Sequence, residues 1–281
     1  MQDTIILPMA DMHSGSPYSL FPNKQMQLVS TNHSQTPLQK IIRGQFDEVC
    51  DFVKSIRTGK RVIVINMGDA IEGLHHSTKE VITQYLVYQQ KIHVELMTEL
   101  SDRIGGWDKL IYINGTPAHA GEAEFEIAKD LGAEYYRQSL DEGDEGESTW
   151  PELRAMIEGT NKIMWAAHHG PAAGRELSRG VSLRNKLKEI YYRCMATGKV
   201  HPDFVVWADK HEHRHGMWED ERNGHIIHGF ICPSWKAKDS YVYKVAALED
   251  PNIGALVLEV GEDIKYHFKT LEIEQDKMVT I

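Results

Sequence analysis

The sequence predicts an α/β fold, and three observations support it. Short apolar runs rich in β-branched residues alternate with helical segments between residues 4 and 208 of the 281-residue chain. From residue 225 onward the pattern changes to strands joined by short turns. Neither a repeat nor a linker divides the chain. We therefore expect a single domain over residues 1–281 with strands buried between covering layers.

Five apolar runs are predicted to be buried strands. The clearest is the stretch 61–69, which ends in Gly68 and Asp69. Gly68 allows a sharp turn there, and Asp69 is then presented at the carboxyl end of a strand, where open sheets bind their ligands. The other four runs cover residues 4–10, 110–113, 162–167 and 203–208.

Helical periodicity fills the stretches between these strands. Apolar residues recur at helical spacing over residues 37–56, and Gly59 is expected to end that helix. Residues 18–35 lack a clear period and predict a long loop. Further helices are expected over 78–104, 122–131 and 174–194, a solvated acidic loop over 141–147, and late strands over 226–231, 240–245, 255–260 and 265–271.

Composition narrows the class of protein. The formal net charge of −10 argues against nucleic-acid or anionic-membrane binding by the surface as a whole. Cys50, Cys194 and Cys232 lie far apart and favour reduced thiols over a disulfide framework. No apolar run reaches the length of a membrane span, and the N-terminus lacks a signal-peptide pattern. We expect a soluble, cytoplasmic protein that does not bind a membrane.

Carboxylates and imidazoles gather at the ends of the five predicted strands. Each short motif alone has an ordinary explanation as a turn, a buried histidine pair or a polar loop. Their joint occurrence favours a metal site, because oxygen and nitrogen donors without thiolate suit divalent Mn, Fe, Zn or Ni. They outnumber the ligands of one tetrahedral ion. In chain order they are Asp11 and His13, Asp69, Asn114 and His119, His168 and His169, and His211 and His213.

The spacing within two of these motifs is two residues. Side chains two apart on an extended strand point the same way. Asp11 and His13 can therefore face the same metal, and the same holds for His211 and His213.

The order Asp-x-His, Gly-Asp, a Gly-Asn-His-like segment, His-Gly and His-x-His resembles the calcineurin-like metallophosphoesterase superfamily over residues 11–213. The resemblance implies a four-layer α/β/β/α sandwich and two divalent metal ions, with Mn as the first expectation and Fe, Zn or Ni as alternatives. The segments 68–76 and 115–121 look most like a phage-type branch, which would place the protein in the host cytoplasm.

The resemblance also implies roles for single residues. His169 is chosen over His168 because the family histidine precedes glycine, as His169 does here. The implied metal ligands are Asp11, His13 and His213 for one ion, Asp69 as the bridge, and Asn114, His169 and His211 for the other.

Two motifs depart from the family pattern. In the third, the metal-binding place is open to Asn114, Thr116 or His119, and we expect His119 to be the catalytic imidazole. In the fifth, Asp209 and Lys210 stand where the family has glycine before its first histidine.

The implied activity is that of a phosphodiesterase that attacks with a hydroxide bridging the metals, and nuclease activity is one form of it. The alternatives are a phosphomonoesterase or protein phosphatase of the same fold, and a non-catalytic scaffold. An amidohydrolase barrel is disfavoured, because the first strand ends in Asp-x-His and the tail is rich in strands.

The expected partner is a phosphate ester, with nucleic acids and nucleotides as candidates; the oligomeric state is open. His75 and Arg175 follow the loops of Asp69 and His169 and are candidate substrate-binding residues. The alternative for both is an ordinary exposed surface.

Overall fold

The computed structural model describes residues 2–74, 80–116, 119, 122–136, 153–171, 179–239 and 251–272. It confirms the α/β class. Its helices are α1 (Pro37–Ile56), α2 (Leu86–Ile104), α3 (Ala123–Asp130) and α4 (Arg179–Thr197).

A six-stranded sheet has the order β13-β12-β1-β4-β5-β6. The strands β1, β4, β5 and β6 run parallel, whereas β12 is antiparallel to β1 and β13 is antiparallel to β12. Their bounds are β1 (Thr4–Met9), β4 (Arg61–Asn66), β5 (Lys109–Ile113), β6 (Glu134–Tyr136), β12 (Asn252–Val260) and β13 (Ile264–Glu272).

A five-stranded sheet has the order β10-β11-β9-β8-β7. Its inner strands β8, β9 and β11 are parallel, and the two edge strands are antiparallel to their neighbours. The bounds are β7 (Leu153–Met156), β8 (Ile163–His169), β9 (Phe204–Ala208), β10 (Arg214–Asp220) and β11 (His225–Ile231), and a separate hairpin consists of β2 (Met26–Leu28) and β3 (Thr31–His33).

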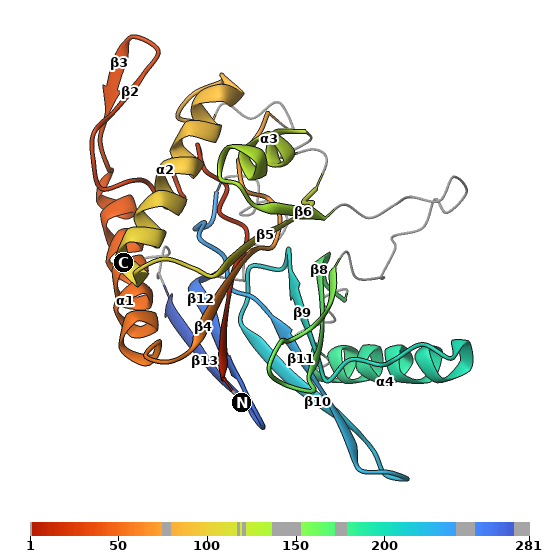
Figure 1. Ribbon diagram of the computed structural model, residues 1–281. Coiled ribbons are helices and arrows are strands. Elements are labelled where there is room, and N and C mark those ends of the chain that lie inside the picture. The colour runs from red at the N-terminus through yellow and green to blue at the C-terminus, as the bar shows by residue number, and fades with distance from the viewer. Residues whose placement is uncertain are drawn as a thin grey trace, which may run out of the picture.

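Three apolar cores hold these layers together. Leu7 of β1 faces the core shared with α1, α2 and α3, whereas its neighbour Ile6 faces the second sheet. Trp207 of β9 packs with Leu183 of α4 on the far side of the five-stranded sheet. Figure 1 shows the three helices on one side and α4 on the other. Within the described residues α4 is the only helix on that outer side, so the complete four-layer sandwich stays a prediction. The assignment of residues 1–281 to a single domain also stays a prediction.

The two long helices show which sequence signals worked. α1 has the predicted bounds, because Thr36 and Gln39 form a reciprocal capping box ahead of a strong apolar stripe. α2 ends at Gly105 as expected, in a left-handed cap. It begins at residue 86 rather than 78, since the side chain of Gln89 donates to the carbonyl of Thr83 and holds the preceding segment as a loop.

Other differences concern short strands. The hairpin β2–β3 lies within the stretch expected to be a loop, and β6, β7 and β10 were not predicted. The expected strand 240–245 and the acidic loop 141–147 lie outside the described residues. No helix of the described chain is both long and apolar enough to cross a bilayer.

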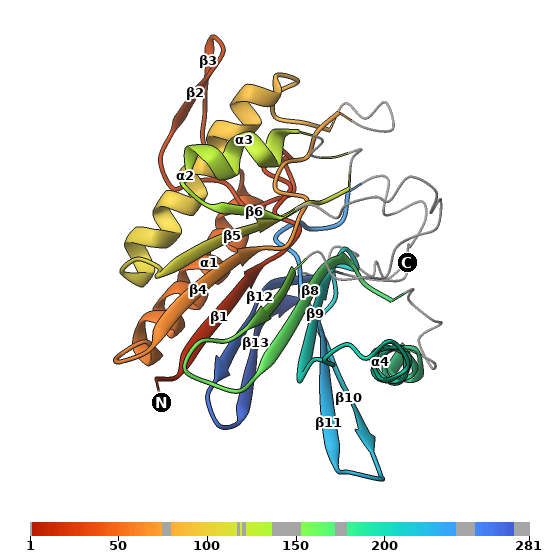
Figure 2. The same cartoon turned by 45° about the vertical axis from the view of Figure 1, so that its right-hand side comes forward.

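The layering positions a site. In the first sheet β1, β4 and β5 are parallel, so their carboxyl ends meet at one edge. The strands β8 and β9 are likewise parallel in the second sheet. Figure 2 shows the two sheets side by side with β8 and β9 facing β1 and β4. The predicted ligands lie at the carboxyl ends of these five strands and in the loops that follow them.

Candidate metal centre

Ligand residues from all five strand ends meet in space. Among the described residues, four overlapping groups of three have ligand atoms that all lie within 4.8 Å of one another. We use the name candidate centre for the residues of these groups, which are Asp11, His13, Asp69, His119, His168, His169, Asp209 and His211.

The backbone turns sharply at most of these ligands. Asp11, His13, Asp69, Asp209 and His211 have φ between 43° and 68°, in the left-handed region that non-glycine residues rarely adopt. Such conformations cost on the order of 1–3 kcal/mol each and gather at functional sites. The ligands two residues apart therefore meet through turned loops, and the expectation of an extended strand at these positions was wrong.

Two glycines let the loops approach one another. A Cβ on Gly68 would lie 2.6 Å from Nδ1 of His168, and one on Gly115 would lie 2.2 Å from the backbone nitrogen of Asp69. Both distances are far below van der Waals contact, so neither position accepts a side chain without moving a ligand. Gly68 also has φ of 95°.

Asp69 lies between the other ligands. Its Oδ2 is 3.5 Å from Nε2 of His168 and 3.9 Å from Nε2 of His13. On the neighbouring side, Nε2 of His211 is 3.8 Å from Oδ1 of Asp11. The backbone nitrogen of Thr116 donates to Oδ1 of Asp69 at 2.7 Å, which fixes the carboxylate plane.

Several of these buried atoms have no hydrogen-bond partner in the part of the chain that the structure describes. They include Oδ1 of Asp11 and both ring nitrogens of His13. His13 Nδ1 does lie 3.1 Å from Oε2 of Glu72, at an ion-pair distance but in an alignment too poor for a hydrogen bond. Leaving a buried polar atom unpaired costs about 1–3 kcal/mol. Converging oxygen and nitrogen donors left unpaired in this way fit a divalent metal ion.

Charges in the centre shift the pKa values of its acids. Burial raises the pKa of Asp11, and the nearby carboxylates of Asp69 and Asp209 raise it further against the opposing effect of His168. Burial also raises the pKa of Asp69, but the neighbouring imidazoles of His168, His13 and His119 outweigh it and leave the pKa below the ordinary value.

Two histidines each donate a hydrogen bond from Nδ1 to a backbone carbonyl. Nδ1 of His168 donates to the carbonyl of Met67 at 2.7 Å, and Nδ1 of His119 donates to the carbonyl of Glu72 at 2.9 Å. Each bond fixes the tautomer and leaves Nε2 to face the centre. The ring of His119 packs edge-on against that of His13, with centroids 4.7 Å apart.

The histidine whose Nε2 faces Asp69 is His168 rather than His169, which the sequence favoured as the ligand. His169 shares a group with His168 and Asp209, so its role as a metal ligand stays a prediction. His168 is fully buried, whereas the side chain of His169 is half exposed and its Nδ1 lies 3.6 Å from Oδ2 of Asp209. His168 follows Met164 and Ala166 on the side of β8 that faces the first sheet. The alternation of side chains along the strand was therefore the signal in the sequence that could have identified His168.

His213 does not join the candidate centre. Its Nδ1 bonds the hydroxyl of Thr270 at 3.0 Å, and its ring stacks on Phe268 with centroids 5.0 Å apart. Because β9 ends at residue 208, the turn brings Asp209 and His211 into the centre instead. The residues of the fifth strand end that join the centre are thus Asp209 and His211, two positions earlier than the expected His211 and His213.

Asn114 is also placed differently from its expected role. Its Oδ1, the atom a metal would need, accepts a hydrogen bond from the hydroxyl of Tyr135 at 2.7 Å. Thr116 lies beside the ligands instead, with its Oγ1 3.2 Å from Nε2 of His168. Both His75 and Arg175 fall outside the described residues, so their expected substrate contacts stay predictions.

Sequence reasoning missed the buried polar residues behind the ligands. The carboxylate of Glu124 accepts hydrogen bonds from the backbone nitrogens of Ala70 and Gly115, at 3.0 and 2.6 Å. Burial raises its pKa to about 7.

His93, on the apolar stripe of α2, donates from Nδ1 to the carbonyl of Ala70 at 2.9 Å and contacts the hydroxyl of Tyr112 at 2.8 Å. A polar residue on an apolar stripe was its only signal.

The uncharged state of His93 leads to a pH-dependent stability. Burial lowers its pKa to about 4 from an unfolded value of 6.5. Between these values the unfolded chain binds a proton that the folded chain does not, so stability falls as pH drops from 6.5 towards 4. In the metal-free protein this residue should lower the free energy of unfolding by about 2 kcal/mol between pH 8 and pH 5.

Urea denaturation of the metal-free protein at both pH values measures this effect. The pH-dependent loss should be about 2 kcal/mol smaller in His93→Gln than in the wild type, whatever the variant's stability at pH 8. An equal loss in both proteins would contradict the assignment.

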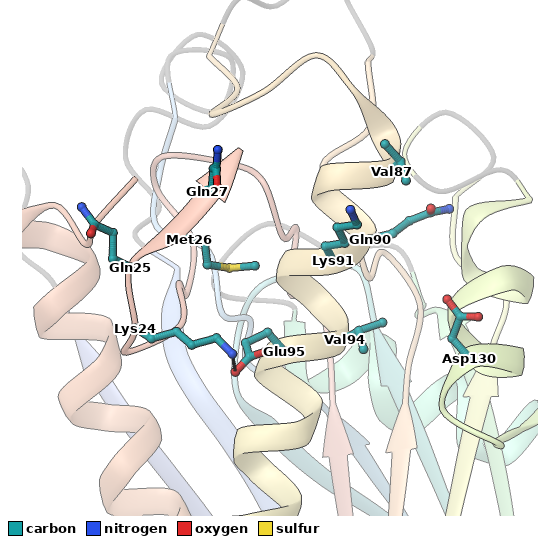
Figure 3. Close-up of a pocket in the computed structure, with 10 residues that line it drawn as sticks. All are labelled: Lys24, Gln25, Met26, Gln27, Val87, Gln90, Lys91, Val94, Glu95 and Asp130. Carbon is teal, nitrogen blue, oxygen red and sulfur yellow. Dashed lines mark ion pairs between the residues drawn. The ribbon is translucent and has the colours of Figure 1, made fainter. Parts of the chain in front are cut away.

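A separate pocket lies away from the candidate centre. It has a volume of about 470 Å³ and is formed by the β2–β3 hairpin, α2 and the end of α3 (Figure 3). Lys24 and Glu95 face each other across it as an ion pair of 2.6 Å. It includes none of the candidate ligands, so the metal chemistry belongs elsewhere.

No protein-family model matches the chain, and no curated protein matches it. One similar solved structure is a Thermotoga maritima protein determined by solution NMR, with 13% identity, 74% of this chain and 98% of that chain covered, and a TM-score of 0.29. Another is a Staphylococcus aureus protein whose assigned activity is 5′-nucleotidase, crystallised with α-ketoglutarate. It has 11% identity, covers 100% of this chain but only 56% of its own, and has a TM-score of 0.38. At these TM-scores neither likeness establishes a fold or an activity.

Proposed function

We propose that the protein is a phosphoesterase that works with two divalent metal ions, in the manner of the calcineurin-like metallophosphoesterases. The observation that carries the proposal is that carboxylates and imidazoles from five separate strand ends form overlapping groups, two of which contain the buried Asp69. Ligand residues in the order of that family, brought together by the fold, support a shared chemistry. A phosphodiester is the proposed substrate class, and nucleic acids and nucleotides are the members to test first.

The ligands divide into two sets around one carboxylate. Asp11, His13 and His211 form one group and are proposed to hold the first ion. The second ion is assigned to His168 and Asp209, which share a group with the half-exposed His169. Asp69 lies between the sets and is proposed to bridge them. When bound, a pair of divalent ions supplies an activated water and neutralises charge on the phosphoryl oxygens.

The residues of the chain then orient the substrate and move protons. His119 keeps Nδ1 bonded to the carbonyl of Glu72, so Nε2 is the nitrogen that would give a proton to the departing oxygen when the imidazole carries two protons. The hydroxyl of Thr116 and the ring of His168 contact each other next to Asp69 and would offer polar groups to the substrate. Burial of Asp11 and Asp69 keeps competing water away from the ligands.

A reducing compartment is the proposed location. Cys50, Cys194 and Cys232 are free and buried. Free thiols are typical of cytosolic proteins.

A substrate panel in Mn²⁺ tests the proposal. The protein is assayed with a chromogenic phosphodiester and its monoester, single- and double-stranded DNA, RNA, cyclic nucleotides and phosphopeptides. We expect turnover of the diester to exceed that of the monoester. Faster turnover of monoesters or phosphopeptides would instead favour a phosphatase. Two bound equivalents of metal without turnover of any substrate would indicate a non-catalytic scaffold.

A further inference from the structure

A buried lysine lies directly behind the candidate centre. Lys236 belongs to the segment that follows β11, where the backbone nitrogen of Trp235 donates to the carbonyl of Asp11 at 3.2 Å. The ammonium of Lys236 is 3.0 Å from Oε1 of Glu72 and 2.7 Å from Oδ2 of Asp239. The side chains of Lys236 and Glu72 are only 4% and 2% exposed, so this contact is made away from water.

Glu72 in turn touches two histidines with two different groups. Its carboxylate Oε2 is 3.1 Å from Nδ1 of His13, and its backbone carbonyl accepts the bond from Nδ1 of His119. The next residue, Gly73, has φ of 71°, and a Cβ there would lie 2.0 Å from the carbonyl oxygen of His119. Glu72 is therefore wedged between a proposed metal ligand and the proposed proton donor.

Stability alone does not account for this arrangement. Burying an ion pair costs desolvation energy that its attraction repays only in part, and an apolar pair of similar volume is often no less stable. Burial lowers the pKa of Lys236, but the charges of Glu72 and Asp239 outweigh this and raise it. The ion pair with Lys236 fixes the position of the Glu72 carboxylate, whose other oxygen lies 3.1 Å from Nδ1 of His13.

We propose that Lys236 is a positioning residue of the centre, which acts through Glu72 to hold His13 for metal binding and His119 for proton donation. This inference rests on the proposed function, because it assumes that both histidines serve a metal centre. Lys236 does not touch the substrate. Groups behind metal-bound histidines typically change metal affinity by about 10–100-fold when removed.

Titration with Mn²⁺ tests the path from lysine to histidine. Glu72→Gln and Lys236→Met should each weaken Mn²⁺ binding by about 10–100-fold. The double variant should be no weaker than the worse single variant, because the lysine acts through the glutamate. Lys236→Arg, which keeps the charge, should recover most of the affinity lost in Lys236→Met.

Glu259→Gln is the matched control. Glu259 also joins a lysine and a histidine, since it contacts Lys60 and lies 3.0 Å from Nε2 of His267 on the far strand β13. This change should leave Mn²⁺ affinity within about twofold. Losses that multiply in the double variant, or an unchanged affinity in Glu72→Gln, would overturn the inference.

A second measurement needs neither metal nor activity. Long-range ¹⁵N–¹H spectra of the metal-free protein report the tautomer of each imidazole. In Glu72→Gln, the tautomer populations of His13 should change, because the carboxylate charge beside its Nδ1 is removed. His119, which bonds the backbone carbonyl of residue 72, and the other histidines should stay unchanged. Identical spectra in the variant and the wild type would overturn the inference even if Lys236→Met does not fold. A wild-type protein that binds no Mn²⁺ would instead remove the proposed function itself.

Discussion

Asp69→Asn is expected to lower phosphodiester hydrolysis in Mn²⁺ by at least about 10³-fold, with the chain still folded. The substitution keeps the shape of the side chain, and its remaining oxygen can still accept the bond from the backbone nitrogen of Thr116. It removes the negative charge that lies 3.5 Å from His168 and 3.9 Å from His13. A neutral amide is a poor bridge between two cations, so both ions should be lost or misplaced.

The rate with a chromogenic phosphodiester is measured for Asp69→Asn and for a control, Asp108→Asn. The carboxylate of Asp108 accepts a bond from the backbone nitrogen of Val62 at 2.7 Å and lies at the opposite end of the strands. The control should keep its rate within about twofold. Circular dichroism checks that both variants fold. Full activity in folded Asp69→Asn would contradict the assignment of Asp69 to the metal centre.

The second large effect separates two histidines of the same motif. His211→Ala should weaken Mn²⁺ binding and reduce hydrolysis by about 10²-fold or more, because Nε2 of His211 faces Asp11 at 3.8 Å. His213→Ala should change both quantities by less than about threefold. Its ring contacts Thr270 and Phe268 on β13 rather than the ligands.

The two variants are close controls for each other, since both remove an imidazole from one short loop. Titration with Mn²⁺ and the rate of diester hydrolysis are the measurements. A larger loss in His213→Ala than in His211→Ala would show that the motif binds metal in the register expected from the family, and that the described geometry is wrong there.

Local signals in the sequence were sufficient for most elements of the fold. The bounds of α1 followed from Thr36, Gln39 and an apolar stripe, because capping and periodicity act within a few residues. The five ligand-bearing strands were found because each is a short, mostly apolar run that is followed by turn or metal-ligand residues. Short edge strands such as β6 and β7 escaped, since pairing with a neighbouring strand defines them and their own sequence does not.

The ligand types were predictable, but the identity of single ligands was not. The choice between His168 and His169 depends on strand alternation next to an irregularity of pairing between Ala167 and His169. The choice of Asp209 and His211 depends on φ values of 68° and 51°, which no residue type there requires. Turned backbones of this kind are imposed by the surrounding fold.

The residues behind the ligands are set by tertiary contacts alone. Glu72 and Lys236 are 164 positions apart in the sequence and meet only in the folded chain. His93 of α2 reaches the carbonyl of Ala70 in the loop that follows β4. Neither spacing nor composition marks such pairs.

Anomalous X-ray scattering from crystals soaked in Mn²⁺ tests the central claim most directly. We expect two Mn peaks about 3.5–4 Å apart, one beside Asp11 and His211, the other beside His168 and Asp209, with Asp69 between them. The absence of any peak among these residues at saturating Mn²⁺, or peaks only elsewhere on the protein, would contradict it.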